Sequence, residues 1–400
     1  MADTHSLPED RRTAAYEAMR ELERRIVDRI RKGGPDSADS PMLVAAREYY
    51  DSARAEQERQ KLFLSVPLLA GLSGDIPKPG DVMTFDAAGP DIVIARGRDG
   101  KVRAFLNMCM HRGAKVMVGC GARKLLTCRF HGWSYDLEGK LVGLPAENAF
   151  EGAASRESVK LVPVPVGEWA GMIFVKAHAG DEQIDVESWL GDMAPNLYHL
   201  GLEECQSVRS NQQIDVAANW KYVLNTYGES YHFASLHPTT FSQTAISNTN
   251  LYDQFGPHYR VVFAASSYRD LMDVSEASWP RIPYGGSHFV FPNTIIYGAP
   301  LPEGGSMIQT YRMFPGSAPS RSVTLMSTYR GGDAPDTVEN SALSDMHDFI
   351  SNVVQTEDYS ISEEGQRNLE SSPPDHMVVF GRNEVALQNV HRAISDALAS

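Results

Sequence analysis

Cysteine is scarce in this sequence: only four of the 400 residues are cysteines, at positions 109, 120, 128 and 205. That number is too small for a fold held together by disulfide bonds, which excludes the class of small disulfide-rich secreted proteins. Cys109 and Cys128 each have a histidine two or three residues further on. For these two cysteines, metal binding therefore competes with simple packing as the explanation.

Long apolar runs and an excess of positive charge are also missing. No apolar run approaches the roughly 20 residues that span a bilayer, and the first residues, MADTHSLPEDRR, do not resemble a secretory signal. Lys and Arg number 37 against 51 Asp and Glu, which gives a net charge of −14 at pH 7. This charge argues against binding to nucleic acid or to anionic membranes. We expect a soluble cytoplasmic protein that binds neither.

The hydrophobic pattern predicts an α+β protein with three segments. Residues 1–63 show the spacing of helices, interrupted by GGPDSADSP at 33–41, with a helix expected again over 42–63. Residues 64–180 consist of short β-rich runs split by Gly, Asp-Gly and Pro turns, which is typical of a small antiparallel β domain. Residues 181–400 mix helical and β-rich patterns, which predicts a second domain with its own sheet.

Two cysteine–histidine pairs lie in the predicted β domain. One residue separates Cys109 from His111; sixteen residues then follow, and two residues separate Cys128 from His131. Two thiolates and two imidazoles can hold either a tetrahedral zinc ion or a [2Fe–2S] cluster. Structural zinc usually takes cysteines in C-x2–4-C pairs, whereas each loop here supplies one Cys and one His. We therefore favour the cluster, and a zinc-stabilised binding module is the alternative from a different class.

The stretch CMHRG…CRFHGW.YD..G, residues 109–139, closely resembles the Rieske [2Fe–2S] domain of the α subunits of ring-hydroxylating oxygenases. The preceding GDVMTFD…DIVIARGRDGKVRAFLNMC is similar to the lead-in of that domain. The resemblance extends over nearly the whole chain after the N-terminal helical segment. It implies that the cluster is bound by Cys109, His111, Cys128 and His131.

The same resemblance implies the architecture of the chain. Residues 64–180 would be the Rieske domain, and residues 181–400 a helix-grip-like catalytic domain with a central antiparallel sheet flanked by helices. For residues 1–63, which lie outside the resemblance, we expect a helical segment packed on the catalytic domain.

A second group of candidate ligands lies in NWKYVLNTYGESYHFASLHP, residues 219–238, which is helical in pattern up to His237. Glu229 lies three residues before His232, on nearly the same face of such a helix. Pro238 disfavours helical geometry at His237, so this histidine can turn towards His232. Two imidazoles with one carboxylate form the facial triad of mononuclear non-haem Fe(II), which leaves positions open for O₂.

In the family that the chain resembles, His232 and His237 match iron ligands. Glu229 matches the acidic residue that bridges cluster and iron across a subunit interface, a position where most members have Asp. The third ligand is the Asp of an ED pair in a C-terminal helix, which here is Glu357-Asp358. We choose Asp358, because on a helix it would face inward together with Val354, Ile361 and Ser362.

The resemblance also implies the activity. The chain would be the terminal oxygenase of a multicomponent system, a homotrimer supplied with NAD(P)H-derived electrons by a ferredoxin or reductase. It would hydroxylate or oxidatively dealkylate a small, aromatic substrate; cis-dihydroxylation of an aromatic ring is the alternative. Phe233, beside His232, and His288 and Phe289, in the β-rich run SHFVFPNTIIYG, are expected to contact the substrate.

Overall fold

The computed structural model describes residues 9–399, which divide into two compact units. One unit consists of residues 63–189; the other combines the chain up to Leu62 with the chain from Leu190 onwards. The second expected boundary, residue 180, falls slightly before the observed one. The α+β prediction is confirmed, because both units are built on antiparallel sheets and the second also has long helices. Within residues 9–399, no helix is both long and apolar enough to cross a membrane.

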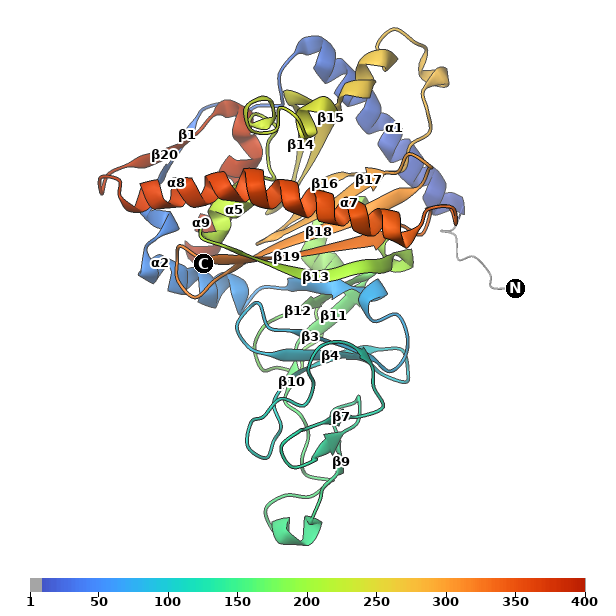
Figure 1. Cartoon of the computed structure of the whole chain (residues 1–400), viewed down its shortest axis with the longest axis vertical. Coiled ribbons are helices and arrows are strands. Elements are labelled where there is room, and N and C mark those ends of the chain that lie inside the picture. Colours follow the sequence, from blue (N-terminus) through green and yellow to red (C-terminus); the bar gives the residue numbers. More distant parts are fainter. Residues whose placement is uncertain (1–8, 400) are drawn as a thin grey trace. The chain divides into compact units, whose positions relative to one another are not determined.

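Short antiparallel strands make up residues 63–189 (Figure 1). They form a five-stranded sheet in the order β10-β5-β4-β3-β6 and two three-stranded sheets, β11-β12-β2 and β7-β8-β9. The strands are β2 (Leu68–Leu72), β3 (Asp81–Phe85), β4 (Ile92–Arg96), β5 (Val102–Leu106), β6 (Gly121–Ala122), β7 (Leu126–Thr127), β8 (Ser134–Tyr135), β9 (Leu141–Gly143), β10 (Pro163–Val164), β11 (Val166–Trp169) and β12 (Met172–Val175). The two loops with the Cys–His pairs follow β5 and β7.

The other unit is built on a seven-stranded antiparallel sheet in the order β13-β19-β18-β17-β16-β15-β14. Its strands are β13 (Gln206–Val216), β14 (Ala245–Phe255), β15 (His258–Ala265), β16 (Gly286–Val290), β17 (Thr294–Pro300), β18 (Ser306–Pro315) and β19 (Ser322–Arg330). The helices from residue 186 onwards are α3 (Val186–Leu190), α4 (Ala194–Tyr198), α5 (Trp220–Asn225), α6 (Phe233–Leu236), α7 (Asn340–Val353), α8 (Ser360–Glu370) and α9 (Val385–Ala399).

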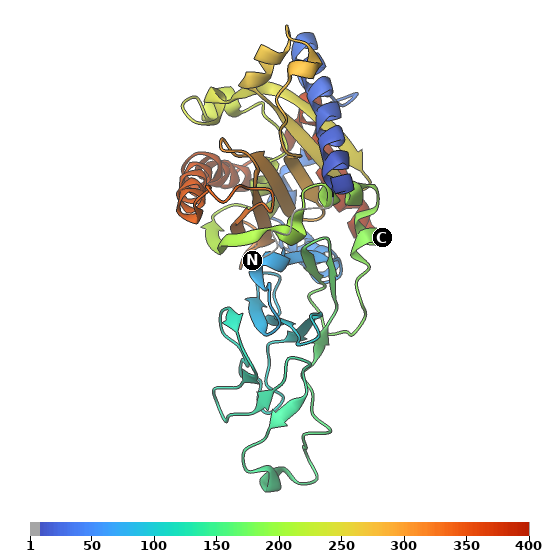
Figure 2. The same ribbon diagram turned by 90° about the vertical axis from the view of Figure 1, so that its right-hand side faces the viewer.

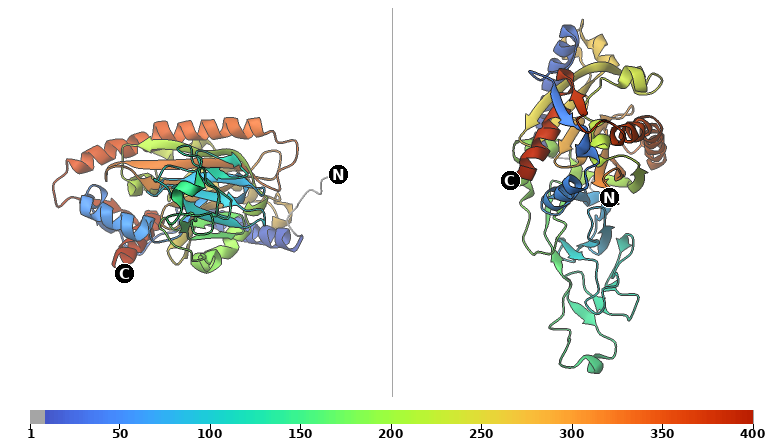
Figure 3. Two further views of the ribbon diagram at one scale, coloured as in Figure 1. Left: turned by 90° about the horizontal axis from the view of Figure 1, so that it is seen from below. Right: turned by 90° about the vertical axis from the view of Figure 1, so that its left-hand side faces the viewer.

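A long helical rod lies along this sheet. Helices α7 and α8 are joined without a break by a π-helical turn, η10 (Val354–Tyr359), and cross the sheet as one rod (Figure 1). Figure 2 views the rod end-on beside the strands, and Figure 3 shows the same relation from other sides. Ile350 lies in α7, and Val354 and Asp358 lie in the π-helical turn.

The N-terminal segment packs on the seven-stranded sheet. Helix α1 (Glu9–Lys32) contacts β14 and β15, and Arg25 pairs with Asp253 at 2.8 Å. The helix expected over 42–63 is wrong in its first part. Met42–Ala45 is a strand, β1, paired with β20 (Met377–Phe380), and helix α2 (Ser52–Glu58) begins only after the capping residue Asp51. Long-range strand pairing here overrides local helical preference.

Two buried histidines make this unit sensitive to acid. Burial, reinforced by the nearby positive charges of Arg260 and Lys221 respectively, lowers the pKa of His288 and of His391 to about 3. Both are therefore neutral in the folded protein, but below about pH 6.5 they are protonated in the unfolded chain. Folding stability that is present at neutral pH is consequently lost as the pH falls towards 3.

We expect the free energy of unfolding to fall between pH 6.5 and 4 by up to about 1.4 kcal/mol per pH unit for each of these histidines. The substitution His391→Gln should reduce that slope, whereas His376→Gln, at an exposed position, should leave it unchanged. Urea unfolding at a series of pH values measures the slope. An unaltered slope in the His391 variant would contradict the assignment.

Candidate metal centres

The two Cys–His loops share one backbone turn. The N–H groups of Cys109 and Cys128 each donate to the carbonyl five residues later, at 2.8 and 2.9 Å. The N–H groups of Gly113 and Gly132 donate back to those cysteines' carbonyls, at 2.9 and 3.0 Å. Both glycines have positive φ angles, 76° and 75°, which residues with side chains avoid. The repeated glycine thus permits two equivalent turns that present a cysteine and a histidine each.

The thiols of the two loops are buried, and the imidazoles lie together. Cys109 and Cys128 are 2% and 3% exposed and belong to one hydrophobic cluster. The ring centroids of His111 and His131 are 4.7 Å apart. His111 also stacks on Trp133, with centroids 5.0 Å apart and planes 9° from parallel. The structure therefore brings all four predicted ligands to one place.

The chemistry of these four side chains fits a [2Fe–2S] cluster. The Nδ1 atom of His111 is buried and has no hydrogen-bond partner among the described residues, so no protein group there competes with a metal for it. Burial raises the pKa of the Cys109 thiol, and a thiolate at this place needs a bound cation beside it. Two thiolates and two imidazoles are the mixed set that Rieske clusters take.

Tyr135, to which no role was assigned from the sequence, reaches this centre. Its hydroxyl accepts a hydrogen bond from the N–H of Met110 at 3.1 Å and lies 3.4 Å from Sγ of Cys109. Because the hydroxyl oxygen already accepts one bond, its own hydrogen is free to point to the sulfur. Hydrogen bonds to cluster sulfurs stabilise the reduced, more negative state and so raise the reduction potential.

We therefore expect Tyr135→Phe to lower the reduction potential of the cluster by on the order of 50 mV, which corresponds to one hydrogen bond of about 1 kcal/mol. A redox titration followed by circular dichroism measures this shift. Cluster content should stay at the level of the unmodified protein. A potential that is unchanged or higher would show that the hydroxyl does not donate to the sulfur.

The second group of candidate ligands lies where a helix is broken. The single helix expected over 219–237 is wrong: α5 ends at Asn225, and α6 spans only Phe233–Leu236. Between them, a Cβ atom on Gly228 would lie 2.5 Å from the side chain of Leu387 in α9. The chain passes too close to α9 there for a side chain. Glu229 and His232 are therefore brought together by a turn rather than by a helical face.

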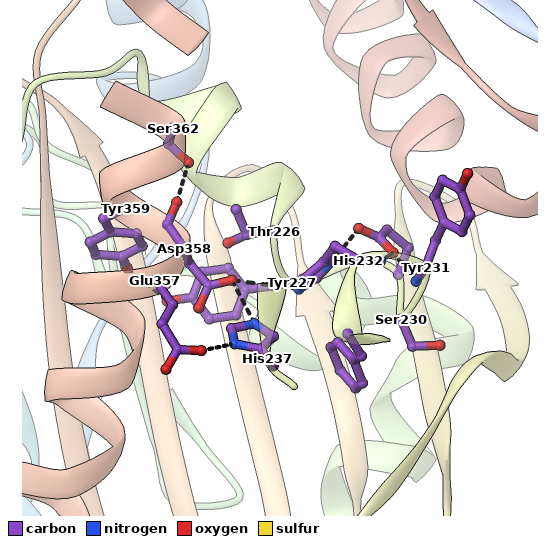
Figure 4. A network of polar contacts seen from close by, with 12 residues as sticks. Thr226, Tyr227, Ser230, Tyr231, His232, His237, Glu357, Asp358, Tyr359 and Ser362 are labelled. Carbon is purple, nitrogen blue, oxygen red and sulfur yellow. Dashed lines mark hydrogen bonds and ion pairs between the residues drawn. The ribbon is translucent and has the colours of Figure 1, made fainter. Parts of the chain in front are cut away.

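His232, His237 and Asp358 converge from two distant segments (Figure 4). Each offers one ligand atom, and these atoms all lie within 4.8 Å of one another. Oδ1 of Asp358 is 3.5 Å from Nε2 of His232 and 3.2 Å from Nε2 of His237. Ligand atoms at right angles, each about 2.1 Å from one ion, are about 3 Å apart. The three side chains thus fit a single metal ion.

Charge also favours a cation at this place. Burial alone would lower the pKa of His232, but the carboxylates of Asp358 and Glu229 outweigh it and raise the value to about 9. Burial would raise the pKa of Asp358, yet the imidazoles of His232 and His237 hold it below its usual range. Without a metal the group therefore binds protons, which a metal ion would displace.

Each histidine is also held on its other nitrogen by a glutamate. Glu229 is bonded to Nδ1 of His232 and accepts the N–H of Tyr231. Glu357, which was not chosen as a ligand from the sequence, lies with Oε2 at 2.6 Å from Nδ1 of His237. In both cases Nε2 is left facing Asp358.

A cavity of about 180 Å³ adjoins the three side chains. Phe233 lines it, as expected, and Ile350, Val354 and Asp358 of the helical rod line another side. Its wall includes six aromatic side chains, namely Tyr227, Phe233, Phe241, Phe263, Tyr297 and Tyr311. Among the described residues that line it, none is Lys or Arg.

His288 and Phe289, which were expected to contact the substrate, are not among the residues that line this cavity; from β16 it is Ser287 that does so. His288 is on the opposite face of the strand, with Nδ1 3.2 Å from the carbonyl of Gly286. Phe289 is on the cavity face, but its ring stacks on Tyr259 with centroids 4.8 Å apart. The period-two alternation of the strand explains why His288 does not line the cavity, and a competing aromatic contact explains the same for Phe289.

Gln309 is a cavity residue that the sequence did not indicate. Its Oε1 accepts a hydrogen bond from the Tyr311 hydroxyl at 3.0 Å, and its Nε2 donates to Oγ1 of Thr328 at 3.2 Å. Thr328 is in turn 2.8 Å from Nδ1 of His347. The chain of hydrogen bonds fixes the orientation of the amide in an otherwise mostly aromatic wall. A glutamine inside a β-rich run gives no local signal of this role.

Family models match both units. Residues 67–164 match the Rieske [2Fe-2S] domain, and residues 202–400 match the ring hydroxylating alpha subunit (catalytic domain). The carnitine monooxygenase oxygenase subunit of Escherichia coli K12 is 32% identical over 203 residues, 49% of this chain and 52% of that protein, so the match spans about half of this relative. The corresponding subunit of Acinetobacter baumannii is 27% identical over 344 residues, 81% of this chain and 84% of that protein.

Solved structures show the same fold. A quaternary ammonium Rieske monooxygenase in complex with L-carnitine superposes with a TM-score of 0.73 at 22% identity, covering 90% of this chain and 96% of that one. Naphthalene 1,2-dioxygenase from Rhodococcus superposes with a TM-score of 0.72 at 18% identity, covering 96% and 99%. At these identities the likeness speaks for the fold only.

Proposed function

Because the chain belongs to the α subunits of the Rieske non-haem iron oxygenases, we propose that it is the terminal oxygenase of a multicomponent system. It takes NAD(P)H-derived electrons from a ferredoxin or reductase and uses O₂ to hydroxylate or dealkylate a small substrate. One observation carries this proposal: His232, His237 and Asp358 meet at the wall of a cavity large enough for a small molecule. A zinc-stabilised module would have no use for this second site.

Two iron cofactors belong to a chain of this family. Cys109, His111, Cys128 and His131 would hold the [2Fe–2S] cluster, and His232, His237 and Asp358 would hold the mononuclear iron. When bound, the cluster stores electrons and the mononuclear iron uses them to activate O₂. The chain's own part is to orient the ligands, to hold the substrate beside them, and to keep bulk water away with the aromatic wall.

Glu229 links the iron site to the rest of the assembly in this proposal. Its carboxylate holds Nδ1 of His232, and we assign it the bridge to the cluster of a neighbouring subunit in a homotrimer. A head-to-tail ring of three chains closes by rotation and gives every iron site such a neighbour. Inter-subunit electron transfer has been described for a quaternary ammonium Rieske monooxygenase of known structure.

The scarcity of cysteine supports a cytoplasmic location.

The cavity favours a neutral or cationic substrate. Relatives act on carnitine, glycine betaine, biphenyl and benzene, according to their names. Six aromatic rings suit either an aromatic ring or a methylated ammonium group, the latter through cation–π contacts. A substrate carboxylate, such as that of carnitine, would find no Lys or Arg among the described wall residues. We therefore expect oxidation at an N-methyl group or an aromatic ring of a compound without a carboxylate.

Product analysis tests this function. The purified protein would be supplied with NADH, a surrogate ferredoxin and reductase, and ¹⁸O₂, together with matched compounds: choline against carnitine, and N,N-dimethylaniline against biphenyl. Released formaldehyde or a labelled alcohol identifies monooxygenation, and a labelled cis-diol identifies dioxygenation. Carnitine turned over faster than choline would contradict the substrate class. A colourless protein that contains zinc would contradict the function itself.

A further inference from the structure

We propose that Glu357 is a positioning residue that fixes His237 in the orientation and tautomer required for metal binding. This inference rests on the proposed function, since it concerns the same metal site. It assigns a role to the glutamate that precedes the predicted ligand Asp358.

The imidazole of His237 is bracketed by two consecutive residues (Figure 4). Oε2 of Glu357 is 2.6 Å from Nδ1, and Oδ1 of Asp358 is 3.2 Å from Nε2. Both carboxylates come from η10, the π-helical turn between α7 and α8. Single π-helical turns within α-helices occur frequently at functional sites. Here the turn directs one carboxylate to each nitrogen of the same ring.

An ionised carboxylate only accepts hydrogen bonds, so the bond to Glu357 requires a proton on Nδ1 of His237. The tautomer that carries this proton leaves the lone pair of Nε2 facing Asp358 and His232. Carboxylates that hold the outer nitrogen of a ligand histidine fix its tautomer and increase its basicity. Glu357 therefore prepares the ring for a metal without contacting the metal.

Glu357 is itself held in place. Oγ1 of Thr240 donates to the same Oε2 atom at 3.0 Å, so the bonded oxygen is fixed from a second direction. Its side chain is 25% exposed, whereas that of His237 is 1% exposed. A purely solvated carboxylate would not keep two bonds on one oxygen. Glu357 is also not one of the three residues whose ligand atoms cluster within 4.8 Å.

The arrangement mirrors that of the other histidine, but with one difference. Glu229 belongs to the same turn as His232 and also accepts backbone N–H groups of that turn. Glu357 instead holds the His237 ring by side-chain bonds alone, across a contact between segments more than a hundred residues apart. Loss of Glu357 should therefore affect the orientation of the His237 ring rather than the path of its backbone.

The test compares Glu357→Leu, Glu357→Gln and Thr240→Val with the matched control Glu364→Leu, at an exposed position of the same rod. The readout is the dissociation constant of Co²⁺, measured by competition with a chelator on protein whose cluster is intact. We expect Co²⁺ binding to weaken about 10–100-fold in Glu357→Leu. Glu357→Gln should weaken binding less than Glu357→Leu, because the amide oxygen accepts the same bond without the negative charge. Thr240→Val should be intermediate, and Glu364→Leu unchanged.

Two results would overturn the inference: Co²⁺ binding in Glu357→Leu equal to that of the unmodified protein, or equal losses in the Leu, Gln and control variants. Equal losses would indicate a merely structural effect. Visible absorption of bound Co²⁺ adds a second readout, because it changes with ligand geometry. If the unmodified protein itself bound no Co²⁺ outside its cluster, the proposed function would fail. If the unmodified protein bound Co²⁺ and Glu357→Leu bound it equally well, only the inference about Glu357 would fail. The two failures are therefore distinguishable.

Discussion

Replacing Asp358 by Ala is expected to remove the mononuclear iron and to reduce turnover by roughly 10³-fold or more, equivalent to about 4 kcal/mol of activation free energy. Asp358 supplies the only carboxylate among the three clustered ligand atoms, and its Oδ1 faces both imidazoles. Without it, only the partly exposed His232 and the buried His237 would be left, and two neutral imidazoles hold a divalent cation more weakly than a set that includes a carboxylate. Iron analysis and steady-state product formation measure the two effects.

The cluster should survive this substitution, because its predicted ligands lie in the other unit. The visible spectrum and the acid-labile sulfide content should therefore match those of the unmodified protein. Glu364→Ala, on the same helical rod, serves as the control for general damage to the helix. Full iron content in the Asp358 variant would disprove its role as a ligand.

Replacing Glu229 by Gln is expected to slow product formation by roughly 10²-fold, while both metal centres remain. The amide can still accept the hydrogen bond from His232, so the imidazole keeps its orientation. What is lost is the negative charge that we assign to the bridge between subunits. A charged hydrogen bond contributes more than a neutral one, by about 1–2 kcal/mol per bond, and a bridge that makes bonds on both sides loses two of them.

Stopped-flow reoxidation of the reduced cluster separates this effect from loss of iron. In the Glu229 variant, the ferredoxin should reduce the cluster at the usual rate, and its reoxidation by O₂ and substrate should be slow. Glu364→Gln provides a matched Glu-to-Gln control away from the site. Fast reoxidation with normal product yield would remove Glu229 from the electron path.

Side chains with rare chemistry and short spacing could be identified from the sequence. The Cys–His pairs need no knowledge of the fold, because a few residues of turn bring each pair together. Asp358 is more than a hundred residues from His237; the resemblance of the Glu357-Asp358 pair to the family indicated it, and the face of a helix supported the choice. The argument from the helical face was only partly correct, because Ile361, which was expected on the same inward face, is 49% exposed. The π-helical turn changes which residues share one side of the rod, and no sequence pattern indicated this turn.

Several of the other differences share a physical cause, which is the influence of residues distant in the sequence. The first residues of the helix expected over 42–63 instead form a strand paired with β20. The helix expected over 219–237 is interrupted where Gly228 lies against α9. Gln309 and Glu357 were missed because their partners come from other strands and helices. The ligand roles of His232, His237 and Asp358 stay predictions, although the structure places them together.

A single-turnover experiment shows where the electrons stored in the cluster are used. The cluster is reduced in the absence of O₂, the external reductant is removed, and O₂ and substrate are then added. We predict that the unmodified protein forms product as the cluster reoxidises, and that the Asp358→Ala variant keeps a reduced cluster and forms none. Equal product from both proteins would contradict the proposal that the electrons are used at His232, His237 and Asp358.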